Sequence, residues 1–154
     1  MNLGWLQGLF PDPKAEAKHA LEQRYFEEAS EAELVKKLAA AMKYPQDQAQ
    51  LLTIVQRKQQ HLGQLETLMG HFNATVPPLE LSHLEGTNTW EALSNALKAE
   101  SHDVESYHEL RPILQDDPDM VALLENIIET ERSNKTDLRE LMGKLDPHAY
   151  DATV

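Results

Sequence analysis

The feature that most constrains the fold is a pattern of apolar residues at three- and four-residue spacing, which runs through four long windows of the sequence. This spacing places the apolar side chains on one face of an α-helix. Proline or polar, glycine-containing stretches separate the windows, and strand signals are nearly missing from the sequence. The pattern therefore predicts an all-α chain with four amphipathic helices.

Proline residues and helix caps mark the expected ends of the first two helices. Asp12 is the predicted N-cap of the first helix and Pro13 its first residue, because proline is well tolerated in the first turn. This helix should extend to about Met42. Pro45 then begins the second helix, which should end near Asn73.

The other two helices carry comparable signals. Asn88 is the predicted N-cap of the third helix, which should end before Pro112 because the residue preceding a proline avoids the α conformation. Asp117 and Pro118 form the same pair of cap and proline at the start of the fourth helix. That helix should end near Leu145.

The two helical pairs also match each other in sequence, which predicts an internal repeat. A shift of 73 residues relates the second helix to the fourth, pairing Pro45 with Pro118, Leu51 with Leu124, Ile54 with Ile127, Leu65 with Leu138, Leu68 with Leu141, Met69 with Met142 and Gly70 with Gly143. A shift of 72 relates the first helix to the third, pairing Leu21 with Leu93, Tyr25 with Leu97, Glu28 with Glu100, Ala32 with Val104, Val35 with Tyr107 and Met42 with Leu114. Leucine spacing alone produces some of these matches, but proline, glycine and acidic matches favour duplication.

These observations predict one domain, an antiparallel four-helix bundle in which two pseudo-symmetric helical hairpins are joined by a long crossover. A chain of 154 residues is long enough to bury one core. The expected segments are an apolar N-terminal arm (1–12), a first repeat (13–73), a crossover (74–87), a second repeat (88–145) and a tail (146–154).

Charge and composition exclude several functions. The net charge of −12 repels nucleic acids and anionic lipid surfaces, so neither is an expected partner. The absence of cysteine excludes disulfides, thiolate metal sites and a thiol nucleophile. The apolar start of the chain lacks the features of a signal peptide, and no segment is long and apolar enough to span a membrane. We therefore expect a cytoplasmic protein, with a protein partner or self-association as the possible contacts.

Four ionisable residues interrupt the apolar faces at about the same level of the bundle. Lys58 lies within the seam of the second helix, and the repeat matches it with Glu131 in the fourth. Glu28 and Glu100 lie midway along the first and third helices, with Glu27 as the alternative to Glu28. An interior charge costs several kcal/mol unless it is paired or ligated, so these side chains are expected to meet.

Over residues 14–145 the chain resembles the ferritin-like superfamily, in particular its rubrerythrin-type members. In that family two single glutamates and two Glu-x-x-His motifs hold a di-iron or di-manganese centre. The corresponding residues here are Glu28 and Glu100 for the single glutamates, with Lys58-x-x-His61 and Glu131-x-x-Asn134 for the two motifs. One motif has lost its carboxylate and the other its histidine.

The resemblance therefore implies an altered metal site and leaves several interpretations open. In the first, Lys58 bridges the glutamates of a core that binds no cofactor. In the second, a single iron or manganese ion is held by Glu28, His61, Glu100 and Glu131. Three glutamates and one ammonium carry a net charge of −2, which one divalent ion neutralises. The third is a dinuclear oxidoreductase, and the fourth is a different register in which Lys58 reaches solvent.

Two neighbouring residues belong to the predicted interior polar cluster with Lys58, namely Asn134 and Tyr107. Tyr107 should project into the core from the third helix, as a hydrogen-bonded tyrosine or as a redox-active phenol. The leading functional interpretation is a ferritin-like binding or interaction module without a cofactor. The alternative is a non-haem iron or manganese oxidoreductase, so the sequence leaves open whether the protein is an enzyme.

Overall fold

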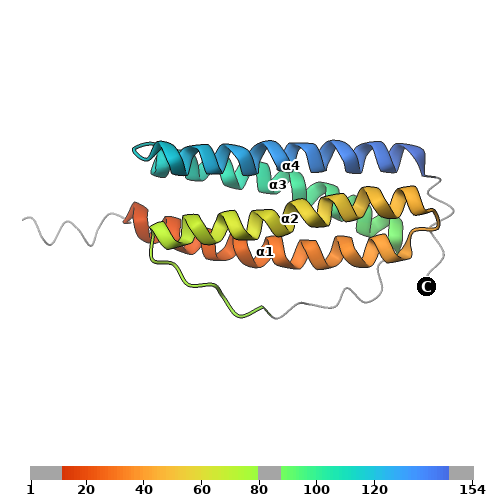
Figure 1. Ribbon diagram of the computed structural model, residues 1–154, viewed down its shortest axis with the longest axis horizontal. Helices are drawn as coiled ribbons and strands as arrows, with labels where there is room; N and C mark the ends of the chain where they lie inside the picture. Colours follow the sequence, from red (N-terminus) through yellow and green to blue (C-terminus); the bar gives the residue numbers. More distant parts are fainter. Residues whose placement is uncertain (1–11, 80–87, 146–154) are drawn as a thin grey trace, which may run out of the picture.

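The computed structural model describes residues 12–79 and 88–145, which form four long helices packed side by side (Figure 1). Helix α1 comprises Pro13–Ala41 and α2 comprises Pro45–His71, while α3 comprises Thr89–Leu114 and α4 comprises Pro118–Lys144. The all-α prediction with four helices is confirmed. The expected N-terminal arm, the tail and most of the crossover lie outside the described residues.

The helices pack as two hairpins, α1 with α2 and α3 with α4, and the hairpins meet through α1–α3 and α2–α4 contacts. Each hairpin turn is short, so its helices run antiparallel. Helix α2 ends at one end of the bundle and α3 begins at the other, so the chain between them connects opposite ends (Figure 1). None of the described helices is long and apolar enough to cross a bilayer.

The helix ends show the expected capping chemistry. The Asp12 side chain accepts a hydrogen bond from the Lys14 amide, and the Asn88 side chain accepts one from the Glu91 amide at 2.8 Å. At the end of α2, Asn73 adopts a φ of 54°, the left-handed conformation that commonly ends a helix. The local sequence therefore sets the helix boundary at these three ends.

One predicted boundary is wrong, because α3 continues through Pro112 to Leu114. Proline in the last turn removes only one backbone hydrogen bond, since its amide would have bonded four residues back. The extra turn buries Leu114, which is 3% exposed and packs in the apolar core with Leu110. Burial of this leucine outweighs the local preference against helix before proline.

A polar layer divides the core into two apolar clusters. One cluster contains the C-terminal part of α1, including Val35, and the other contains the N-terminal part, including Leu21. On α2 the two clusters lie on either side of residues 58–61, and on α3 and α4 they lie on either side of residues 100–103 and 131–134. The four helices thus bring their interior polar residues to one level of the bundle.

Candidate functional site: a carboxylate cluster around Lys58

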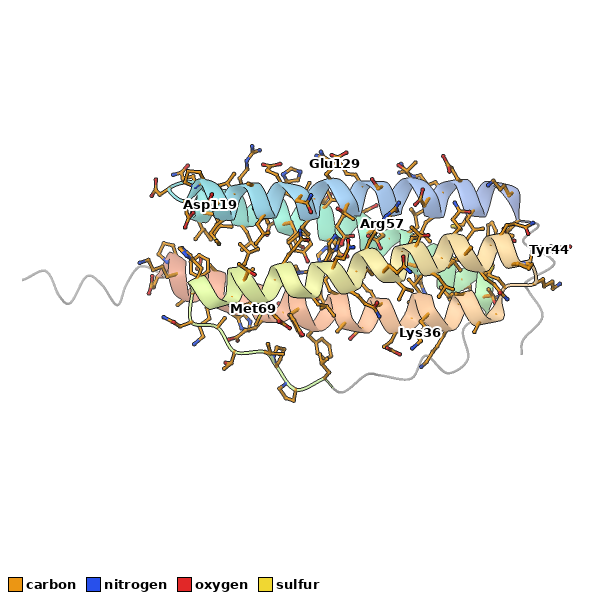
Figure 2. All side chains as sticks on the ribbon, viewed as in Figure 1. Lys36, Tyr44, Arg57, Met69, Asp119 and Glu129 are labelled. Atoms are coloured by element: carbon orange, nitrogen blue, oxygen red, sulfur yellow. The ribbon has the colours of Figure 1, made fainter. Side chains whose placement is uncertain are left out.

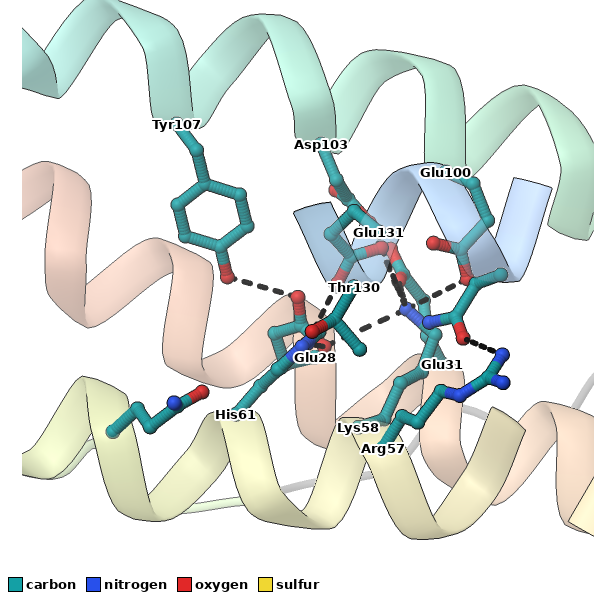
Figure 3. A network of polar contacts seen from close by, with 12 residues as sticks. Glu28, Glu31, Arg57, Lys58, His61, Glu100, Asp103, Tyr107, Thr130 and Glu131 are labelled. Atoms are coloured by element: carbon teal, nitrogen blue, oxygen red, sulfur yellow. Dashed lines mark hydrogen bonds and ion pairs between the residues drawn. The ribbon is translucent and has the colours of Figure 1, made fainter. Parts of the chain in front are cut away.

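The polar layer contains the four charged residues that the sequence places in the seam. Their side chains converge between the helices (Figure 3). Lys58 and Glu131 are completely buried, and Glu28 and Glu100 are each 1% exposed. Glu28 is the inward residue of the first helix, whereas the neighbouring Glu27 keeps 29% of its side chain exposed.

Lys58 lies at the centre of the cluster and does not reach solvent. Its Nζ atom is 2.8 Å from a carboxylate oxygen of Glu100, 3.5 Å from Glu28 and 3.6 Å from Glu131. The register in which this lysine points outward is therefore wrong. Burial alone would lower the lysine pKa, but the surrounding carboxylates hold the pKa of Lys58 well above its usual value.

Two further carboxylates, Glu31 and Asp103, belong to the cluster and were not predicted. The Nζ atom of Lys58 is 2.8 Å from Glu31 and 3.8 Å from Asp103. A signal for both was present, because the 72-residue shift that pairs Glu28 with Glu100 also pairs Glu31 with Asp103. The first helix of each hairpin therefore carries two acidic residues three positions apart, a spacing that places both on the same face of the helix.

A second cation reaches the cluster from α1. Arg24 is 5% exposed, and its guanidinium donates a 2.5 Å hydrogen bond to Asp103 and forms an ion pair with Glu27. Sequence spacing offered no signal for this role, because the repeat matches Arg24 with Ala96. Arg24 and Lys58 together supply two positive charges to the five carboxylates, so an excess of three negative charges remains when all five are ionised.

His61 lies on the α2 face next to Lys58 and contacts two of the glutamates. Its Nδ1 atom is 2.8 Å from Glu131 and 3.5 Å from Glu28. Among the described residues, however, neither nitrogen of the His61 ring and neither carboxylate oxygen of Glu131 has a hydrogen-bond partner of acceptable geometry. Fully buried polar atoms are rarely left in this state.

Tyr107 and Asn134 are both fully buried, as expected for the polar layer, but they have different partners. The Tyr107 hydroxyl donates a 2.8 Å hydrogen bond to Glu28 (Figure 3). The Asn134 side chain accepts one from Arg57 at 3.2 Å, and Arg57 also binds Asp137. Asn134 therefore joins the polar contacts between α2 and α4, and its side chain has no described contact with the carboxylates.

The acids of the cluster differ in how readily they ionise. Burial raises the pKa of Glu28, but the attraction of Lys58 and the close approach of His61 and Glu131 outweigh it, so the pKa lies below its usual range. Burial and the nearby Glu31 raise the pKa of Asp103 to about 9. Burial and the neighbouring acids also raise the pKa of Glu131 well above its usual value. The cluster therefore holds protons at neutral pH unless another cation replaces them.

Three groups of these side chains place ligand atoms within 4.8 Å of one another, a separation that a single ion can bridge. Among the described residues the groups are Glu28, His61 and Glu131; Glu100, Asp103 and Glu131; and Glu27, Glu31 and Asp103. The first combines an imidazole with carboxylates, and the other two contain carboxylates alone. Imidazole nitrogen suits iron and related transition metals, whereas carboxylates alone suit manganese, magnesium and calcium.

Comparisons of the chain with protein-family models, with curated proteins and with solved structures found no match. We therefore infer the function of the cluster from its geometry.

Proposed function

We propose that this protein is a ferritin-like, non-haem metal-binding protein whose core holds one divalent transition-metal ion, with Lys58 standing in for a second ion. Glu28, His61 and Glu131 would hold the metal. The observation that carries this proposal is the pair of fully buried side chains, His61 and Glu131, whose ring nitrogens and carboxylate oxygens lack hydrogen-bond partners among the described residues. Such atoms are suited to ligate a cation.

The arrangement around Lys58 supports one ion rather than two. The ammonium group contacts Glu100 and Asp103, so it lies within the carboxylate group that also includes Glu131. A divalent ion placed there would meet the positive charge of Lys58 at short range. Lys58 also contacts two members of the group with His61, but its distances to Glu28 (3.5 Å) and Glu131 (3.6 Å) are longer than the 2.8 Å to Glu100, and no described contact joins His61 itself to a cation.

The charge of the cluster favours the binding of a cation. Five ionised carboxylates against Arg24 and Lys58 leave an excess of three negative charges, and one divalent ion reduces this excess to one. Without an ion the cluster must retain protons, as the raised pKa values of Asp103 and Glu131 indicate. A divalent ion bound by Glu131 would replace a proton and relieve this repulsion.

The donor set indicates iron or manganese. Imidazole nitrogen with carboxylate oxygen suits these ions better than calcium or magnesium, which prefer oxygen alone. When bound, such an ion supplies Lewis acidity and, for iron or manganese, one-electron redox chemistry. The residues of the chain would position it: His61 and Glu131 as ligands, Glu28 as a ligand fixed by the Tyr107 hydroxyl, and Lys58 as the neutralising charge on the other side.

Metal analysis tests the proposal. Protein purified from cells grown with excess iron and manganese should contain about one equivalent of metal per chain, because the group with His61 is the one that Lys58 approaches least closely. Glu131→Gln should abolish binding, since it removes a charged ligand without changing the shape of the side chain. Glu129→Gln is the matched control, because Glu129 points outward from the same helix (Figure 2).

Two outcomes would overturn the proposal. Protein that contains no metal in both the parent and Glu129→Gln forms would favour the interaction module, in which Lys58 alone balances the carboxylates. Two equivalents that are both lost in Glu131→Gln would favour a dinuclear oxidoreductase and would exclude Lys58 as a substitute for an ion.

A further inference from the structure

The three carboxylate groups form a continuous series from the surface of the bundle to His61. The outer group of Glu27, Glu31 and Asp103 shares Asp103 with the middle group, and the middle group shares Glu131 with the inner group. Exposure of the side chains falls along the series, from 29% for Glu27 and 16% for Glu31 to 1% for Asp103 and 0% for Glu131. The shared residues therefore link the partly exposed acids to the buried ones.

A groove between α1 and α3 lies at the outer end of this series. Its volume is about 350 Å³, and Arg24 forms part of its lining. Glu16 and Glu109 also line the groove, so its walls carry acidic side chains that attract cations. Because Arg24 binds both Glu27 and Asp103, its guanidinium separates the groove from the carboxylates.

The guanidinium occupies the outer group in the way that Lys58 occupies the middle group. Arg24 contacts Asp103 through Oδ1, while the buried Oδ2 atom of Asp103 has no hydrogen-bond partner among the described residues. In the middle group, Glu100 Oε2 has no hydrogen-bond partner among the described residues, and the oxygens of Glu131 have only the contacts with Lys58 and His61. Asp103 Oδ2 lies 3.8 Å from Lys58 Nζ, so the two tethered cations together leave buried carboxylate oxygens without a hydrogen bond.

From this series the geometry points to a second, outer cation-binding site formed by Glu27, Glu31 and Asp103, which Arg24 fills as an exchangeable counter-ion and through which divalent ions reach the core. The path rests on the proposed inner metal site, whereas the outer site itself does not. Since all three outer ligands are carboxylates, the site should accept hard cations such as Mn²⁺ or Ca²⁺.

The opposite face of the bundle provides a control. Arg57 bridges α2 to α4 through Asp137 and Asn134, and it too lines a surface groove. Asp137 belongs to none of the candidate cation groups found among the described residues. Removing Arg57 should therefore expose no cation site.

A Mn²⁺ titration tests the outer site, with the free ion measured by electron paramagnetic resonance. Glu131→Gln forms the background because it removes a ligand from both the inner and the middle groups. In this background, Arg24→Met should bind one equivalent of Mn²⁺ about tenfold more tightly than Arg57→Met does. Adding Glu27→Gln should remove that gain. Circular dichroism checks the fold, and Arg24→Gln repeats the test with a polar side chain of similar length.

Equal Mn²⁺ binding by the Arg24 and Arg57 variants would overturn the outer site, whatever the inner site does. The path is tested separately by the rate of Mn²⁺ uptake into the otherwise unmodified protein. Glu27→Gln should slow uptake several-fold, while the exposed Glu129→Gln should keep the parent rate. Equal rates would overturn the path. Absence of metal from the parent protein would instead overturn the proposed function, and the double variants would still decide whether the outer site exists.

Discussion

The two hairpins have the same architecture but bring different charges to the polar layer. The first hairpin supplies both fixed cations, Arg24 and Lys58, together with Glu28 and Glu31. The second supplies three acids, Glu100, Asp103 and Glu131, and none of its described residues brings a cation to them. The first contribution is therefore neutral when His61 is neutral, whereas the second carries three negative charges.

This difference explains how the hairpins recognise each other. Ion pairs across the hairpin interface join Arg24 to Asp103 and Lys58 to Glu100, and a hydrogen bond joins Tyr107 to Glu28. Two copies of the second hairpin would bring six acids together without a cation, and two copies of the first would bring the lysines together. Charge complementarity therefore specifies the pairing of unlike hairpins, while apolar burial supplies most of the stability.

The largest effect is predicted for a substitution that removes the lysine from this interface. Lys58→Met should lower the free energy of unfolding of metal-depleted protein by about 3–5 kcal/mol, because buried carboxylates lose their shared cation. Chemical denaturation measures the change. Lys36→Met is the control: Lys36 is exposed on α1 and points away from the bundle (Figure 2), so its substitution should change stability by about 0.5 kcal/mol or less. Equal losses in the two variants would show that Lys58 does not neutralise the cluster.

The second prediction concerns a substitution that makes the first hairpin as acidic in character as its partner hairpin. Lys58→Glu should destabilise metal-depleted protein and should increase its capacity for Mn²⁺, because a carboxylate replaces the competing ammonium. Mn²⁺ at about a hundredfold excess over its Kd should restore about 2.7 kcal/mol to the free energy of unfolding. Thermal unfolding with and without Mn²⁺ measures this recovery. A variant as stable as the parent, with unchanged metal uptake, would contradict the role of Lys58.

The third prediction concerns the protons held by the acidic hairpin. The pKa of Asp103 is raised to about 9 in the folded protein, whereas an unfolded aspartate has a pKa of about 3.9. The stabilisation from this proton is complete below the unfolded pKa and is lost as the pH rises through the folded value. Metal-depleted protein should thus lose about 2 kcal/mol of stability between pH 6.5 and 8. Asp103→Asn should reduce this loss, and an unchanged pH profile would contradict the assignment.

The smallest effects are predicted for two tyrosine variants, one at a tyrosine that joins the hairpins and one at a tyrosine within a single hairpin. Tyr107→Phe should cost about 1.5 kcal/mol, because Glu28 loses a buried hydrogen bond to its carboxylate. Tyr25→Phe should cost less, about 0.5 kcal/mol, since Tyr25 bonds to the partly exposed Glu66 within the first hairpin. Chemical denaturation of the two variants measures both. A larger loss for Tyr25→Phe would reverse the expected order.

The sequence predicted the helices well because apolar spacing and proline caps are local signals. Lys58 and Glu28 could be placed in the core because each interrupts an apolar seam. Glu31 and Asp103 were missed because each lies one turn beyond the expected residue, at the edge of the apolar face, where one sequence does not settle which way a side chain points. Their match in the repeat was the usable signal.

Other features depend on tertiary contacts that the sequence does not encode locally. Arg24 approaches Asp103 across 79 positions of the chain, and no motif announces this pair. The helix through Pro112 likewise depends on the packing of Leu114 rather than on local preference. The internal duplication stays a prediction, supported by the matched positions in the two hairpins.

The most direct test of the account is the anomalous diffraction of crystals grown with Mn²⁺. A single peak bounded by His61, Glu28 and Glu131, with the Lys58 ammonium on its far side against Glu100, is the predicted result. Two peaks within the polar layer, or a peak at the position that the ammonium should occupy, would contradict the claim that a lysine replaces one of two ions.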